Sequence, residues 1–262
     1  MSTPAHTSTQ LEVTEAFASA AERFAVAVAS VDPRAAVPTC PGWTVYDLVV
    51  HLGNVHAWAA TIVETGRSAQ SQNDEPPSRK PRAMSAWYAG KAEDLYAVLR
   101  DSDPERPCWN FAFGLGTSSF WPRRQLHETT IHGVDLALAS GRPPELDRDV
   151  SADGVDEALR VFGHRMHLRG YPAELTAPIS VVATDVGRAW TVSPAIVDGV
   201  PPQPPAPPVV RDGVTDGADR IEGPAGALYA LIWKRLPSTD ASLEFVGDAT
   251  RINAFLASRL TA

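Results

Sequence analysis

The stretch RRQLHETTIHGVD, residues 123–135, holds side chains that could bind a metal. His127 and Glu128 look like the start of the H-E-x-x-H motif of zinc proteases, but that motif needs a second histidine where Ile131 stands. On a helix, Glu128 and His132 lie four residues apart and share a face, whereas His127 and His132 lie five apart and do not. The segment therefore predicts a Glu128–His132 pair on one face, without His127.

The same helical face also carries Arg124 and Asp135. A polar stripe of this kind has two interpretations: a solvated face with an ion pair, or part of a binding site. His51 favours the second, because it stands beside Leu52 on the flank of an apolar stripe and should point into the protein. His56 falls nearer the outside of that helix.

His51, Glu128 and His132 thus form a ligand set from two helices. An inward histidine can also be a core residue hydrogen-bonded to a carbonyl, but a buried glutamate without a partner is costly, and a divalent cation removes that cost. Two imidazoles and one carboxylate are typical of open catalytic zinc sites, whose fourth position takes water or substrate. A structural zinc would use more cysteines than Cys40 and Cys108. The set therefore predicts one divalent metal, zinc in first place.

The first half of the sequence predicts the helices that would position these residues, because its apolar side chains recur every three or four residues. Thr44 is the expected N-cap of the second helix, and Pro122 lies in the first turn of the fourth. A polar, proline-rich loop covers residues 68–82, and Gly114 and Gly116 punctuate another loop. Four helices of this length form a bundle. They are expected at roughly residues 13–31, 44–62, 84–99 and 119–141.

The second half predicts an α+β domain. After a helix at 151–168, the segments ISVVATD and AWTVS are short, β-branched and separated by a glycine turn, as in a hairpin. The proline-rich run 199–208 is a loop, and GALYALIWKRL, residues 226–236, is an apolar helix. A strand, SLEFVG, and a helix from Ala249 to Leu260 follow. Strands and helices do not alternate regularly, so the class is α+β overall and not doubly wound.

The bulk properties exclude some partners. The net charge of −8 over 262 residues argues against a broad nucleic-acid surface. No apolar run approaches the roughly 20 residues that cross a bilayer, and the N-terminus lacks a signal-peptide pattern. Two cysteines fit a reducing compartment. We expect a cytoplasmic protein, a monomer or weak homodimer, with no nucleic-acid or membrane partner.

Two segments carry a family resemblance: TCPGWTVYDLVVHLGNVHAW, residues 39–58, and WPRRQLHETTIHGVD, residues 121–135. Together they resemble the mycothiol-dependent maleylpyruvate isomerase family, whose N-terminal half is a DinB-like four-helix bundle. GALYALIWKRL, followed by a strand ending in VGDA, is similar to the family's C-terminal domain, which resembles sterol carrier proteins. The resemblance implies a DinB-like metal-binding bundle at 1–148 and a sterol carrier-like α+β domain at 149–262.

The resemblance also implies roles for single residues. The family's zinc ligands correspond to His51, Glu128 and His132, and a catalytic arginine of the second domain corresponds to Arg235. Its spacing of four from Leu231 places Arg235 on the inward face of the predicted helix, although an arginine there can also turn outward to the helix end. Matching positions suggest that Arg124 and Asp135 contact the thiol cofactor or orient His132. The alternative for each is a salt bridge of the bundle. Trp43 is interpreted as the hydrophobic anchor of its turn.

Mycothiol, the thiol that the resemblance implies, is a cysteinyl pseudo-disaccharide of actinobacteria. A thiol bound to zinc is deprotonated and can add to a small electrophile, here one that carries a carboxylate. The sequence leaves open whether the reaction is an isomerisation or a transfer. Two alternatives stay open: a zinc hydrolase with Asp135 as the general base, and a non-enzymatic small-ligand-binding protein.

Overall fold

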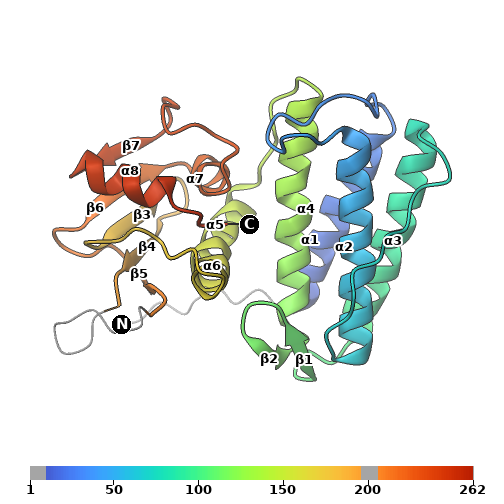
Figure 1. Ribbon diagram of the computed structural model, residues 1–262, viewed down its shortest axis with the longest axis horizontal. Coiled ribbons are helices and arrows are strands. Elements are labelled where there is room, and N and C mark those ends of the chain that lie inside the picture. Colours follow the sequence, from blue (N-terminus) through green and yellow to red (C-terminus); the bar gives the residue numbers. More distant parts are fainter. Residues whose placement is uncertain (1–9, 196–205, 262) are drawn as a thin grey trace. The chain divides into compact units, whose positions relative to one another are not determined.

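The computed structural model describes residues 10–195 and 206–261 (Figure 1). The chain divides into two compact units, Met1–Glu145 and Leu146–Ala262. The first is a helical bundle with one small hairpin, and the second combines a five-stranded sheet with helices. The predicted α+β class with an N-terminal four-helix bundle is therefore confirmed.

Four long helices form the bundle of the first unit. α1 and α2 each pack against both α3 and α4. The core between them contains Phe17, Leu48, Leu52 and Leu95, none of which has exposed surface. Apolar spacing of three and four residues gives each helix one such face, and its burial stabilises the bundle. The bounds are α1 Gln10–Val28, α2 Val45–Thr65, α3 Pro81–Asp101 and α4 Phe120–Ala139.

The start of α2 follows the sequence closely. The Thr44 side chain accepts a hydrogen bond from the Asp47 amide, and the Asp47 carboxylate accepts one from the Thr44 amide, so a full capping box is present. Gly66 ends the helix in the left-handed conformation, with φ of 70°. The predicted N-cap of α2 is therefore confirmed. α3 begins at Pro81, so the first two residues of the helix overlap the loop predicted at residues 68–82.

The expectation of a loop at Gly114 and Gly116 is wrong. An antiparallel hairpin of β1 (Pro107–Asn110) and β2 (Gly114–Thr117) lies there. The Asn110 side chain accepts hydrogen bonds from the amides of residues 112 and 113 and closes the turn. Glycines are unfavourable in strands, so the two glycines of β2 favoured the prediction of a loop.

The second unit is built on the sheet β5-β4-β3-β6-β7, in which only the β3–β6 pair is parallel. The predicted β3–β4 hairpin is confirmed, with Gly187 in the turn at φ of 65°. No sequence pattern pointed to β5 or β6. The proline-rich run 199–208 was expected to be a loop, and its residues 199–205 lie outside the described residues. The strands are β3 Ile179–Ala183, β4 Arg188–Ser193, β5 Val209–Asp212, β6 Asp219–Gly223 and β7 Glu244–Val246.

The helices of the second unit differ from the prediction at their ends. The segment expected at 151–168 is continuous but contains a π-helical turn, η1, between α5 and α6. α7 ends at Ile232, not at residue 236, because Lys234 takes the left-handed conformation with φ of 63°. Arg235 therefore lies beyond the helix, and its predicted place on the inward helical face is wrong. The bounds are α5 Arg148–Glu157, η1 Ala158–Phe162, α6 Gly163–Leu168, α7 Ala225–Ile232 and α8 Ala249–Ala257.

The predicted domain boundary after residue 148 falls at the first residue of α5.

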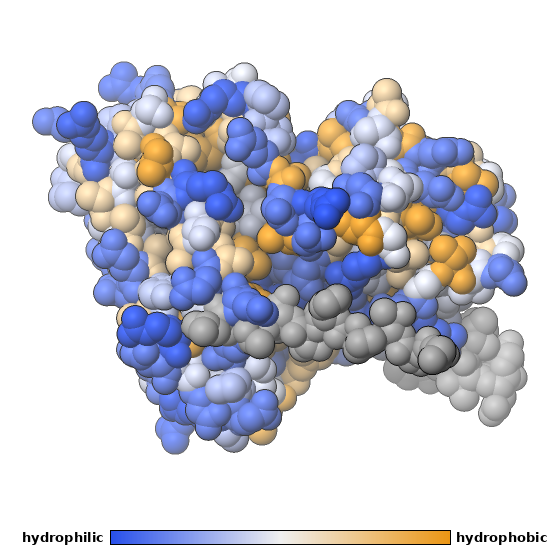
Figure 2. Space-filling model, turned by 180° about the vertical axis from the view of Figure 1, so that it is seen from behind, coloured by the Kyte–Doolittle hydropathy of each residue, from blue (hydrophilic) through white to orange (hydrophobic). Residues whose placement is uncertain are grey.

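Hydrophilic residues spread over the face shown in Figure 2, with hydrophobic residues in small separate patches. Within residues 10–195 and 206–261, the helices are too short or too polar to cross a membrane.

Candidate metal centre

α2 and α4 bring His51, Glu128 and His132 together. The Nε2 atoms of both histidines lie 3.4 Å from the same glutamate oxygen, Oε1 of Glu128. One ligand atom from each of the three residues lies within 4.8 Å of the others. His127 is not a member of this group, although it is fully buried. The structure thus places the three predicted ligands side by side.

Two of the three ligand–ligand distances fit a tetrahedral metal. Zinc binds imidazole nitrogen and carboxylate oxygen at about 2.0–2.2 Å, so neighbouring ligand atoms on a tetrahedron are about 3.4 Å apart. The two nitrogen–oxygen distances of the site have this value. The His51 side chain is 36% exposed, against 17% for Glu128 and 9% for His132. The site is therefore accessible to an outside ligand near His51.

Buried polar partners hold the other atoms of two of these residues. Arg124 Nη2 donates to Oε2 of Glu128 at 2.7 Å, which leaves Oε1 to the histidines. Nδ1 of His132 donates to Oδ2 of Asp135 at 2.8 Å, which directs Nε2 toward the cluster. These are the salt bridge considered for Arg124 and the orienting hydrogen bond considered for Asp135. Contact of either residue with a thiol cofactor stays a prediction.

The loop before α2 adds a further layer that no sequence pattern pointed to. Thr39 Oγ1 donates to Oδ1 of Asp135 at 2.5 Å, and Cys40 Sγ lies 3.6 Å from Oδ2. Asp135 has no exposed surface. The TCPGW stretch, residues 39–43, lies close to His51 in sequence, and this indicated that the loop is near the cluster. Sequence proximity does not predict which side chain of the loop contacts α4.

Trp43 forms a wall of the cluster. Its ring centroid lies 4.9 Å from that of His51 and 6.3 Å from that of His132, the latter with an interplanar angle of 24°. The interpretation of Trp43 as an anchor of its turn is therefore incomplete, because the indole also packs on both imidazoles. Its half-buried position keeps water away from one side of the histidines.

The cluster attracts positive charge. Burial lowers the pKa of His132, but hydrogen bonds that its ring donates to Asp135 and Glu128 outweigh this effect and raise the pKa to about 9. Burial likewise raises the pKa of Glu128, but the Arg124 charge and the histidine hydrogen bonds hold it well below its usual range. Two carboxylates therefore lie beside His132, and they favour a proton on its ring or a bound cation.

His56 was expected near the outside of its helix, and this is wrong. It is fully buried, and its Nδ1 donates to Oε1 of Gln125 at 2.8 Å while Nε2 accepts from the Tyr88 hydroxyl at 3.1 Å. Phe17 of α1 and Tyr88 of α3 pack against the ring. Burial lowers the pKa of His56 to about 4, so the imidazole is neutral. His56 is a satisfied core residue.

Arg235 lies in the second unit. Its Nη1 donates to the carbonyl of Trp233 at 2.7 Å, and its guanidinium lies 6.0 Å from the Trp233 ring centroid. Its catalytic role stays a prediction.

Comparisons with known proteins agree with the motifs. Residues 14–137 match the family model of the mycothiol maleylpyruvate isomerase N-terminal domain. The crystal structure of the mycothiol-dependent maleylpyruvate isomerase aligns with a TM-score of 0.61 at 13% identity, over 93% of this chain and 95% of that chain. A histidine-to-alanine mutant of that enzyme aligns with a TM-score of 0.54 at 11% identity, over 85% and 87% of the two chains.

At these identities the structural likeness concerns the fold, and no curated protein sequence gives a significant match. The family model covers the segment that supplies all three clustered residues. Residues 14–137 therefore belong to the mycothiol maleylpyruvate isomerase N-terminal domain family, as the two motifs predicted.

Proposed function

We propose that this chain is a mycothiol-dependent isomerase that binds one divalent metal, preferably zinc, through His51, Glu128 and His132. One observation carries the proposal: a single glutamate oxygen lies 3.4 Å from both imidazole nitrogens, at the spacing of tetrahedral ligands. The domain family and the fold of the structural relatives support mycothiol as the thiol. A cytoplasmic location and a small, carboxylate-bearing electrophile belong to the same proposal.

Each residue has a part in this chemistry. A bound divalent metal would keep a thiol deprotonated at neutral pH. Arg124 and Asp135 fix the orientations of Glu128 and His132, so little reorganisation is needed when the ligands are in use. The exposed part of His51 gives the thiol access to the cluster, and the Trp43 ring packs against the two imidazoles.

The outcome of the reaction depends on the fate of the carbon–sulfur bond. If the thiol adds to a conjugated cis double bond and is then eliminated after rotation, the product is the trans isomer. If the bond persists, the protein is a transferase. The activity named for the structural relatives favours the isomerase.

The hydrolase alternative requires a general base beside the metal. Asp135 was the candidate, but its oxygens accept hydrogen bonds from His132 and Thr39, and it has no exposed surface. A carboxylate engaged in this way is a poor acceptor for a proton from water. The arrangement therefore supports thiol chemistry over hydrolysis.

The test combines metal analysis, mycothiol titration and turnover of maleylpyruvate with and without mycothiol. The control variant is Glu93→Ala, which removes an exposed carboxylate outside the cluster. Both this variant and the wild-type protein should hold one metal per chain and require mycothiol for turnover. Glu128→Ala should lose both the metal and the turnover. Turnover of an ester or amide by the metal-loaded protein without mycothiol would support the hydrolase instead, and absence of both metal and mycothiol binding would refute the proposal.

A further inference from the structure

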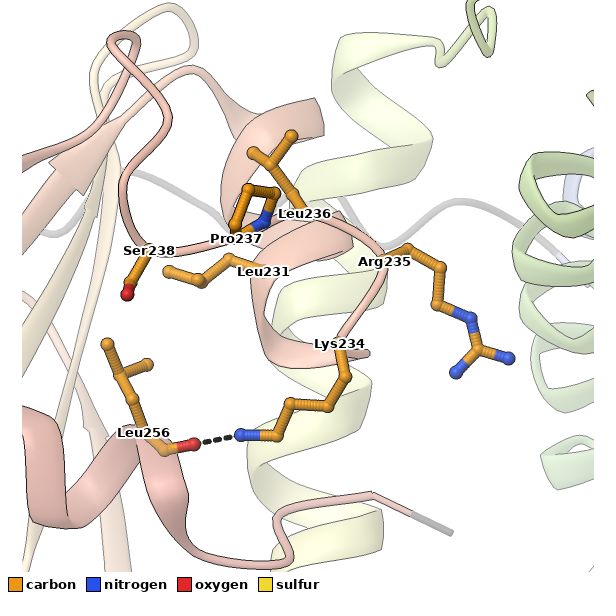
Figure 3. Close-up of a pocket in the computed structure, with 7 residues that line it drawn as sticks. All are labelled: Leu231, Lys234, Arg235, Leu236, Pro237, Ser238 and Leu256. Atoms are coloured by element: carbon orange, nitrogen blue, oxygen red, sulfur yellow. Dashed lines mark hydrogen bonds between the residues drawn. The ribbon is translucent and has the colours of Figure 1, made fainter. Parts of the chain in front are cut away.

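A pocket of about 430 Å³ lies within the second unit, where the chain leaves α7 and passes the last turn of α8. Its size is in the range of small-molecule sites. Apolar walls come from Leu231, Leu236 and Leu256, and polar groups come from Lys234, Arg235 and Ser238. Figure 3 shows Lys234 extending toward Leu256 and Arg235 extending away on the other side of the chain.

The backbone of Lys234 is unusual. Among the described residues with positive φ, nine are glycines and Lys234 is the one that has a side chain. The position follows the end of α7, where the amides of Arg235 and Leu236 both donate to the Ala230 carbonyl. Glycine is the usual residue at such a helix end, because a Cβ makes the left-handed conformation costly. A lysine that occupies this position despite the cost suggests that its side chain is needed.

The Lys234 side chain brings a positive charge to an apolar surface. Its ammonium donates to the Leu256 carbonyl in α8, and no carboxylate of the described residues forms an ion pair with it. An ammonium has three donors, and the residues that the structure describes accept from one of them. Lys234 is exposed to solvent overall, but desolvation of its ammonium lowers the pKa, and a neighbouring anion would offset that desolvation. The two remaining donors adjoin a pocket with a hydroxyl at Ser238.

We propose that this pocket binds a small organic carboxylate with a hydrocarbon body. The carboxylate would accept hydrogen bonds from Lys234 Nζ and Ser238 Oγ, and the hydrocarbon would pack on Leu231, Leu236 and Leu256. The ammonium selects an anion over a neutral molecule, and the leucines select an apolar body over an inorganic ion. The proposal concerns the second unit alone and needs no metal, so it is independent of the proposed function.

The test is a titration of the metal-free, ¹⁵N-labelled full chain with hexanoate, followed through backbone amide shifts. Shifts should be confined to the segments around residues 231–238 and 252–258. Hexan-1-ol keeps the hydrocarbon but lacks the charge, so its affinity should be at least about tenfold lower than that of hexanoate. Equal binding of the alcohol would make the pocket a purely apolar site and would overturn the proposal, as would an absence of hexanoate shifts in these segments.

Three variants assign the effect to the ammonium. Lys234→Met keeps most of the apolar stem and should weaken hexanoate binding about tenfold, whereas Lys80→Met, an exposed lysine of the first unit, should not. Lys234→Gly suits the left-handed backbone, so it should fold with an unchanged or higher melting temperature and still lose hexanoate. Unchanged hexanoate affinity in Lys234→Met and Lys234→Gly would limit Lys234 to capping α8 and refute the proposal.

Discussion

Two polar clusters span the same pair of helices, α2 and α4, and they differ in almost every property. The metal cluster, His51, Glu128 and His132, is ionic and partly open. The core cluster, His56 and Gln125 with Tyr88 of α3, is neutral and sealed. The pKa of His132 is raised to about 9, and that of His56 is lowered to about 4. Both residues are histidines, so the difference in pKa comes from the side chains that surround each ring.

The difference has a simple physical origin. His51 and His56 are five positions apart, so they leave α2 in different directions. His56 meets a neutral amide and a phenol, which can satisfy both ring nitrogens without a charge. His132 meets two carboxylates, which favour a cation at the ring. A site for a metal thus requires unbalanced negative charge as well as the ligand atoms.

The largest expected effect comes from removal of a clustered imidazole. His132→Ala should abolish tight metal binding, because it removes one of three ligands and also the hydrogen bond from His132 to the buried Asp135. Metal content after dialysis against a weak chelator measures this. The matched control is His127→Ala, a buried histidine of the same helix outside the cluster, which should keep the metal. The reverse result would show that the assignment of the two histidines is wrong.

Acid should act on the core cluster. The folded pKa of His56 is about 4, below the ordinary 6.5, so between these values the unfolded chain binds a proton that the folded chain does not. The free energy of unfolding should therefore decrease as the pH falls from 6.5 to 4, by up to about 3 kcal/mol from this residue. Urea unfolding of the first unit in metal-free protein at pH 7 and pH 4.5 measures the change.

The control for this pH effect is His56→Gln, which does not titrate. It should be less stable at pH 7 but should lose less stability on acidification than the wild type. His132 should respond in the opposite sense: with its pKa raised to about 9, its contribution in metal-free protein is present below pH 6.5 and is lost as the pH rises toward 9. Equal acid sensitivity of wild type and His56→Gln would contradict the neutral, sealed state of His56.

The smallest expected effect belongs to the layer behind the metal cluster. Asp135→Asn keeps an acceptor for His132 Nδ1 but removes the negative charge, so metal affinity should fall about 10- to 100-fold. Competition with a chromophoric chelator measures the affinity, and the exposed Asp94→Asn serves as the control. An unchanged affinity together with a lowered melting temperature would restrict Asp135 to holding the loop at Thr39.

Local spacing in the sequence was sufficient for much of the bundle and for the Glu128–His132 pair of the metal cluster. Apolar periodicity located all four bundle helices, and Thr44 with Asp47 marked the start of α2. Helical geometry paired Glu128 with His132 and set His127 apart, because residues four apart on one helix face the same way in any fold. The direction of His51 toward α4 also followed from its place beside an apolar stripe, although its side chain is 36% exposed. These features depend on residues close in the chain.

Features that depend on distant segments were decided by the tertiary structure. The sequence does not show that α3 packs against His56, that Trp43 packs on both histidines, or that Thr39 reaches Asp135. It also misplaced the end of α7, since the left-handed turn at Lys234 occurs where a glycine is the usual signal. Periodicity fixes the direction of a side chain from its own helix, but the burial, pKa and partner of that side chain depend on which other segment packs against it.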